Sequence, residues 1–164
     1  MTWQLRDPVF RDALRALDLR LSGRYALAGT VGAQIHVAAA IGLEKRGPPA
    51  HAIEIVALGG ADVPSSVGDV PLLRVETLGF DASIAAARST IQIAEERYVV
   101  ASPEHVLGTS LAARELLPDA KWACFVLMRT LAGRLDLEEV RGFLKRHDGT
   151  ERQTLLAELA YLAA

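Results

Sequence analysis

Two glutamates that interrupt apolar stretches are the residues best suited to chemistry in this chain. Glu54 lies in the apolar run Ala52–Leu58, and Glu76 lies in the run Leu72–Leu78. A carboxylate inside a buried strand must be paired, protonated, bound to a metal or close to an open sheet edge. If the two strands are neighbours, the carboxylates converge and can hold Mg²⁺ together with substrate phosphates. A plainer interpretation stays open, in which Glu54 faces solvent at a sheet edge and Glu76 pairs with Arg74.

A second candidate site lies where the chain turns from a short strand into a helix. Gly29 and Thr30 follow the apolar residues Tyr25–Ala28 and precede a helix predicted over about Val31–Ile41. The free N–H groups and the dipole of a helix N-terminus attract anions. Gly32 has no side chain that would obstruct a close approach. Gly29, Thr30 and Gly32 are therefore candidates for binding a nucleotide phosphate, although an ordinary strand-to-helix turn also uses small residues.

Three single residues have the chemistry for a role but sit in ordinary surroundings. Arg46, in the loop after this helix, is either a phosphate neighbour or a solvated loop charge. His36 lies among alanines and valines, which indicates a partly buried histidine with one partner, while a ligand or base role stays open. Cys124 lies in the apolar run WACFVLM, where a cysteine is usually a small buried hydrophobe.

The elements that must position these residues follow from local signals. Asp7 and Pro8 predict the start of a helix that ends by Ser22 and Gly23. After the strands Tyr25–Ala28, Ala52–Leu58 and Leu72–Leu78, the alternation predicts a short helix and then a β-hairpin. The hairpin strands are Thr90–Ile93 and Tyr98–Ala101.

The C-terminal third is predicted to be helical. Three starts carry capping residues: Ser102 with Pro103, Asp119, and Asp136 with Glu139. They open helices predicted over Pro103–Leu117, Lys121–Leu131 and a segment ending near Arg146. Residues 150–153 predict the start of a last helix. The sequence thus indicates an α+β domain, a small mixed sheet flanked by helices, in which residues 1–101 contain the sheet and residues 102–164 are helical.

The composition indicates a soluble protein without a strong electrostatic preference. The 164 residues fit one domain, with 51% hydrophobic residues, 23% charged residues and a net charge of −2. A nucleic-acid partner is possible but is not indicated by this charge. The sequence has one cysteine, no signal-peptide pattern at its start and no apolar run of membrane-spanning length. We expect a cytoplasmic protein that does not enter membranes, whose oligomeric state the sequence does not define.

The order of three motifs resembles a known family. The motifs are GRYALAGTVGAQIH before the first acid, VVASPEHVLGTSLAAR after the hairpin, and LAGRLDLEEVRGFLKRH near the end. In this order they resemble the small bacterial nucleotidyltransferase-like proteins grouped with abortive-infection toxin nucleotidyltransferases, over about Asp7 to His147. The resemblance implies a DNA polymerase beta-like nucleotidyltransferase fold and a toxin–antitoxin type of context. It also implies a glycine turn that holds a triphosphate, an Asp-x-Asp pair on the next strand, and a third carboxylate one strand later.

The chain departs from the family pattern at most of the residues that matter. Gly29 and Thr30 replace a Gly-Gly or Gly-Ser turn, and the acid pair falls at Ala52-Ile53-Glu54, so its first acid is an alanine. Glu76 best matches the third carboxylate. A lysine implied in the Pro103–Leu117 helix is replaced by Thr109 or Ser110. The basic residue before the acid pair is replaced by proline, unless Arg46 or His51 substitutes for it.

Three functions follow from this pattern. The first is a degenerate, inactive or impaired nucleotidyltransferase-like domain that binds a protein, a nucleotide or a nucleic acid. The second is an active Mg²⁺-dependent nucleotidyltransferase with Glu54 and Glu76 as catalytic metal ligands. The third is an unrelated α/β interaction protein.

Overall fold

A mixed six-stranded sheet organises the chain, in the order β3-β4-β2-β1-β6-β5. The computed structural model describes residues 4–42, 50–117, 119–147 and 149–164. β2 pairs antiparallel with β1 and parallel with β4, while β1 pairs parallel with β6. The strands are β1 Tyr25–Leu27, β2 Ile53–Ala57, β3 Ser66–Val67, β4 Val70–Arg74, β5 Ser89–Ile93 and β6 Glu96–Val100.

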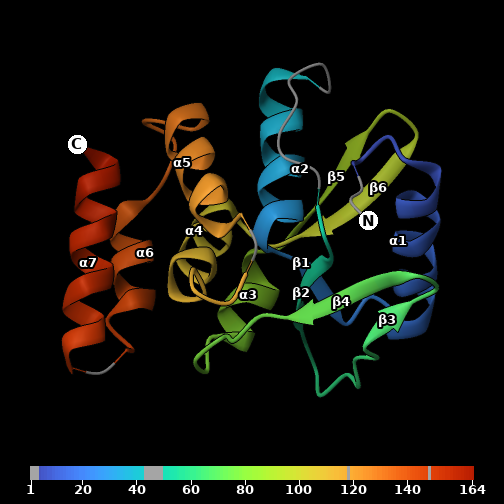
Figure 1. Cartoon of the computed structure of the whole chain (residues 1–164), viewed down its shortest axis with the longest axis horizontal. Helices are drawn as coiled ribbons and strands as arrows, with labels where there is room; N and C mark the ends of the chain where they lie inside the picture. Colours follow the sequence, from blue (N-terminus) through green and yellow to red (C-terminus); the bar gives the residue numbers. More distant parts are fainter. Residues whose placement is uncertain (1–3, 43–49, 118, 148) are drawn as a thin grey trace.

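Helices surround this sheet and continue beyond it, so the predicted α+β class is confirmed. Figure 1 shows α4 to α7 gathered on one side, with α7 outermost, and α1 at the opposite end of the molecule. The C-terminal third is helical, as predicted. The helices are α1 Pro8–Leu21, α2 Gly29–Ile41, α3 Asp81–Ala87, α4 Pro103–Ala112, α5 Ala120–Thr130, α6 Leu137–Leu144 and α7 Gly149–Ala163.

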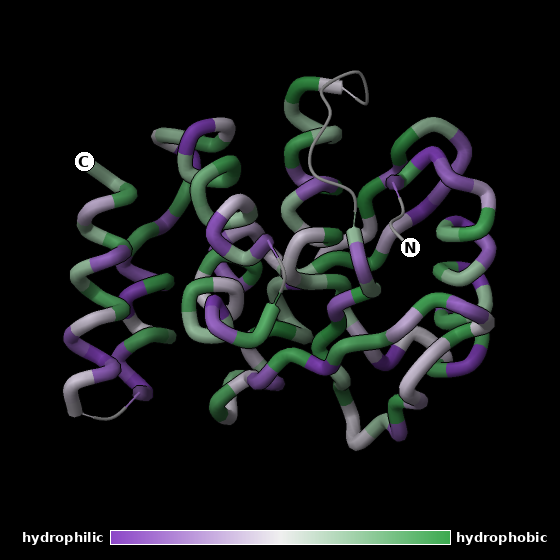
Figure 2. The backbone as a smooth tube through the Cα atoms, in the orientation of Figure 1, coloured by the Kyte–Doolittle hydropathy of each residue, from purple (hydrophilic) through white to green (hydrophobic). Residues whose placement is uncertain are grey.

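The central helix, α2, packs against the sheet on one side and against α4 and α5 on the other. Its residues from Gly29 to Val37 are all buried, because the first turns are enclosed on every side. β1 and β2 are buried along their whole length. Figure 2 shows hydrophobic residues running along the central strands, whereas hydrophilic residues recur on the outer helices α1 and α7. The first turn of α2 thus lies at the centre of the core.

Helix starts follow the predicted capping residues in most cases. Asp7 accepts from the N–H of Val9 at 2.9 Å, and Ser102 accepts from the N–H of His105 at 3.2 Å. Asp136 accepts from two N–H groups of α6. Asp119 is an exception, because it has a left-handed backbone and makes no capping hydrogen bond. Its carboxylate instead lies 3.5 Å from Nε2 of His51.

Two predicted element boundaries are wrong. The strand predicted over Leu72–Leu78 is β4, which begins at Val70 and ends at Arg74, because β3 and β4 form a hairpin around Gly68. The left-handed backbone of Leu78 then belongs to a turn. The helix predicted to reach Leu117 ends at Ala112, and turns replace its last five residues. The boundary of β4 affects the predicted site, since Glu76 lies beyond the end of this strand.

Candidate functional site

Glu54 and the first turn of α2 form one buried unit. The carboxylate of Glu54 is 2% exposed and accepts from the N–H of Val31 at 3.2 Å. The N–H and the hydroxyl of Thr30 also donate to it. β2 lies between β4 and β1, so Glu54 is not at a sheet edge. Of the interpretations left open by the sequence, the structure therefore supports a paired acid.

Gly29 is required by this arrangement. Its φ is +58°, in the left-handed region that favours glycine. A Cβ built on Gly29 would lie 2.6 Å from both Cδ and Oε2 of Glu54, which is closer than atoms can pack. The helix terminus predicted to bind phosphate is thus covered by a carboxylate of the same chain. Gly32 has a different neighbour, because its absent side chain leaves room for Val106 of α4.

Burial controls the acidity of Glu54. Removal from water raises the pKa of Glu54 to about 7, and the hydrogen bonds from Val31 and Thr30 offset part of that rise. The carboxylate is the form that the helix N-terminus stabilises, whereas the surrounding apolar core favours the neutral acid. Glu54 consequently changes its charge near neutral pH.

Glu76 lies in a different environment. It is exposed, two residues beyond Arg74, and its Oε1 accepts from the N–H groups of Thr77 and Leu78 at 3.2 Å each. The β2–β4 register pairs Glu54 with Leu73 and Ile55 with Arg74. Paired residues point to the same face of the sheet, and successive residues along a strand alternate between the faces. Leu73 therefore shares the face of Glu54, and position 76, three residues later, falls on the opposite face. The structure makes β2 and β4 neighbours, as expected, but uses the two carboxylates separately.

Other residues singled out in the sequence have structural roles. His36 is buried, and its Nε2 lies 2.7 Å from the carbonyl oxygen of Ala101, which confirms a buried histidine with a partner. Burial raises the pKa of the Cys124 thiol to about 12. Thr109 donates its hydroxyl to the carbonyl of His105, and Ser110 is fully buried. Arg46 lies outside the described residues.

These residues do not fit the metal site that the resemblance implies. A two-metal transfer site needs several carboxylates that converge on one point. Ala52 supplies none, Glu54 is bonded to α2, and Glu76 is bonded to its own turn. Within the described ranges, no group of three or more His, Cys, Asp or Glu residues is arranged to hold a metal ion.

A polar cluster that the sequence analysis did not identify joins α3, α4 and α6. His105 is 2% exposed, with Nδ1 2.8 Å from Oγ of Ser102. The same Oγ accepts from the backbone N–H of His105 at 3.2 Å. Nε2 faces Ser83 at 3.4 Å and Glu139 at 3.6 Å.

Burial sets the charge state of this cluster. It lowers the pKa of His105, an effect that Glu104 partly offsets, and it raises the pKa of Glu139. In the tautomer that carries the proton on Nε2, a neutral His105 can donate toward the carboxylate of Glu139, 3.6 Å away, and link α4 to α6. The cluster therefore fastens helices together rather than presenting a base to a ligand. A histidine directly after a Ser-Pro-Glu helix start was the signal available in the sequence.

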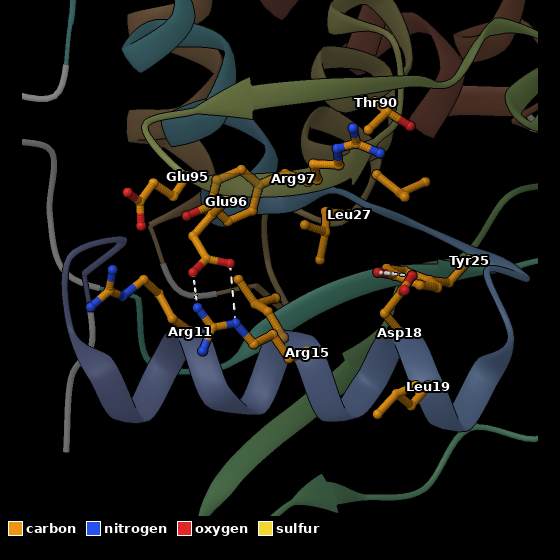
Figure 3. A pocket seen from close by; sticks show the side chains of 13 residues that line it. Arg11, Arg15, Asp18, Leu19, Tyr25, Leu27, Thr90, Glu95, Glu96 and Arg97 are labelled. Carbon is orange, nitrogen blue, oxygen red and sulfur yellow. Dashed lines mark hydrogen bonds and ion pairs between the residues drawn. The ribbon is translucent and has the colours of Figure 1, made fainter.

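A cleft of about 430 Å³ lies between α1 and the β5–β6 hairpin. Figure 3 shows Arg15 of α1 pointing to Glu96 of β6 across this cleft, and Asp18 pointing to Tyr25. Nε of Arg15 donates to Glu96 at 3.2 Å, and the Tyr25 hydroxyl donates to Asp18 at 3.0 Å. Both interactions connect α1 to the sheet, so we interpret the cleft as part of the packing interface between α1 and the sheet.

A second cleft, of about 420 Å³, opens beside Glu76 between the β4–α3 connection and the end of α4. It is separate from the first turn of α2, since none of Gly29, Thr30, Gly32 and Glu54 lines it. Of the residues predicted to form a single site, the structure thus joins Glu54 to Gly29 and Thr30 and places Glu76 elsewhere.

Comparison with known proteins does not assign the chain to a family. No protein-family model matches it, and no curated protein matches it significantly. In the part of the chain that the structure describes, no helix is both long and apolar enough to cross a membrane.

Proposed function

We propose that this chain is a degenerate nucleotidyltransferase-like domain that acts as a binding module and does not transfer nucleotides. The proposal combines the order of the motifs with the geometry around α2. The glycine turn opens a helix directly after β1, the only acid of the next strand is Glu54, and β4 lies beside that strand. This order of elements supports descent from a nucleotidyltransferase-like protein. The hydrogen bonds of Glu54 and Glu76 within the fold support the loss of activity.

One observation carries the inactive part of the proposal. The carboxylate of Glu54 covers the N-terminus of α2, where the family resemblance expects a triphosphate. A nucleotide phosphate at that terminus would have to displace Glu54 from its hydrogen bonds with Thr30 and Val31. A carboxylate that binds metal would have to face away from those N–H groups. One side chain cannot serve both arrangements.

Incubation with labelled ATP, CTP, GTP and UTP in Mg²⁺ or Mn²⁺ tests the proposal. We expect no product from the wild-type protein, from Glu54→Gln or from Glu95→Gln, an exposed hairpin control. Product formation by the wild type and the control, but not by Glu54→Gln, would establish an active enzyme. Residual activity of about 10⁻² of the wild type in Glu76→Gln would then assign a positioning effect to that acid.

Isothermal titration calorimetry with the same nucleotides identifies the kind of partner. Binding that does not require a metal ion and persists in Glu54→Gln assigns a nucleotide ligand at a site other than the α2 terminus. If no nucleotide gives a heat of binding, the proposed ligand of the module is a protein or a nucleic acid.

A further inference from the structure

The cleft beside Glu76 has the composition of a small-molecule site. Its volume of about 420 Å³ is within the range of roughly 300–1,000 Å³ found for ligand pockets. Apolar side chains make up most of its lining, and three polar residues stand among them. The lining residues are Arg74, Val75, Glu76, Leu78, Ala112, Ala113, Leu116, Leu117 and His147.

Aromatic contacts join the β4–α3 connection to α6. The rings of Phe80, after β4, and Phe143, in α6, have centroids 5.1 Å apart. The guanidinium of Arg146 stacks 4.8 Å from the ring of Phe80. Gly108 of α4 admits this packing, because a Cβ there would lie 2.9 Å from Phe143. These contacts join Phe80, the residue before α3, to α4 and α6.

Its apolar surface is left open to water. Leu116, in the turn after α4, is 83% exposed, and Leu78 on the facing turn is half-buried. Leu117 is buried at the base. A ligand with an apolar body would cover Leu116 and remove this surface from water, at a gain of about 25 cal/mol per Å².

Two polar groups of the cleft have no hydrogen-bond partner in the described part of the chain. The side chain of Arg74 makes no ion pair or hydrogen bond with any described residue, and it does not pair with Glu76, whose carboxylate accepts from Thr77 and Leu78. Nε2 of His147 is buried without a hydrogen-bond partner, while its Nδ1 lies 3.9 Å from Glu151. The exposed guanidinium of Arg74 is therefore available to a ligand, whereas burial closes Nε2 of His147 off from the cleft.

We propose that this cleft binds a small organic anion with an apolar body. The anionic group pairs with Arg74, and the body covers Leu116. An arginine fork matches both carboxylate and phosphate geometry, so either group fits. The site is distinct from the α2 terminus and does not depend on whether the chain descends from a nucleotidyltransferase.

Binding of 1-naphthylacetate and 1-naphthyl phosphate, with 1-naphthylacetamide as the neutral analogue, tests the proposal. We expect both anions to perturb backbone NMR signals of Val75, Leu78 and Ala113, and the amide to bind about tenfold more weakly. The ratio of the two anion affinities shows whether the site prefers a carboxylate or a phosphate.

Arg74→Ala should weaken both anions by about tenfold and leave the amide unchanged. Arg97→Ala, which removes the same charge at the α1–hairpin cleft, should have no effect. Equal binding of the amide and the anions, or equal affinity in Arg74→Ala and Arg97→Ala, would overturn the proposal, as would the absence of any binding.

Discussion

The two glutamates of the predicted site lie in opposite surroundings, although their strands are neighbours. Glu54 is in the core, where the N–H groups of α2 bind its carboxylate and the pKa is raised to about 7. Glu76 is at the surface, where it accepts from the two N–H groups that follow it. Glu54 thus connects β2 to a helix 23 positions away, whereas Glu76 accepts hydrogen bonds only from the next two residues.

This difference indicates where a ligand can enter. At the Glu54 end, the helix N-terminus is covered by the chain itself, and Gly29 leaves no space between them. At the Glu76 end, the carboxylate accepts from its own turn instead of pairing with Arg74, and a cleft lies beside it. The hydrogen bonds of Glu54 block the N-terminus of α2, whereas the local hydrogen bonds of Glu76 leave the neighbouring cleft open.

The largest effect is expected from Gly29→Ala, which tests the close contact at the first position. An alanine at a φ of +58° costs about 1–2 kcal/mol, and displacement of Glu54 costs about 1–3 kcal/mol more. We therefore expect the free energy of unfolding to fall by about 4 kcal/mol, as measured by urea denaturation.

Gly60→Ala is the matched control, since Gly60 has a φ of +69° and no atom within 4 Å of a built Cβ. It should cost only about 1–2 kcal/mol. A double variant with Glu54→Ala should be less destabilised than the sum of the single variants, by at least about 1 kcal/mol. Equal losses for Gly29→Ala and Gly60→Ala would contradict the contact.

The next effect is the pH dependence that Glu54 introduces. Because its pKa is raised from 4.5 to about 7, the folded protein holds a proton that the unfolded chain releases. The stability from this group is complete below pH 4.5 and is lost as the pH rises through about 7. Over this window the loss is about 3 kcal/mol.

Glu54→Gln should remove this loss, since glutamine accepts the same hydrogen bonds without ionising. Urea denaturation of both proteins between pH 5 and pH 8 gives the difference. Burial lowers the pKa of His36 and His105, so their contribution is lost as the pH falls below 6.5. It is common to both proteins and cancels. Parallel stability curves would show that Glu54 is ionised throughout.

Local signals made much of the fold predictable. Asp7 with Pro8 and Ser102 with Pro103 fix helix starts through contacts within three residues. The ends were less predictable, because apolar spacing continues past the true boundary. Val75 and Leu78 extend the pattern of β4, and Leu116 and Leu117 extend that of α4, although turns begin earlier. Only the partner strands and helices define where such elements stop.

The sequence predicted that Glu54 needs a hydrogen-bond partner, but it did not predict which residues surround it. The sequence shows that Glu54 requires a partner in an apolar strand, yet that partner is Val31, 23 positions away. β4 ends at Arg74, four residues before the predicted end at Leu78, and this places Glu76 beyond the strand and apart from Glu54. His147 was not identified at all, because its place in a cleft depends on how Phe143 of α6 packs on Phe80.

The smallest effect is expected from Glu76→Ala, which tests the local role at the second position. The variant loses two hydrogen bonds at an exposed turn, so we expect the free energy of unfolding to fall by only about 0.5 kcal/mol. Glu95→Ala on the hairpin is the exposed control. MgCl₂ should shift the melting temperatures of the wild type and Glu76→Ala equally. A shift confined to the wild type would mean that Glu76 binds the metal, and the separation of the two carboxylates would then have to be abandoned.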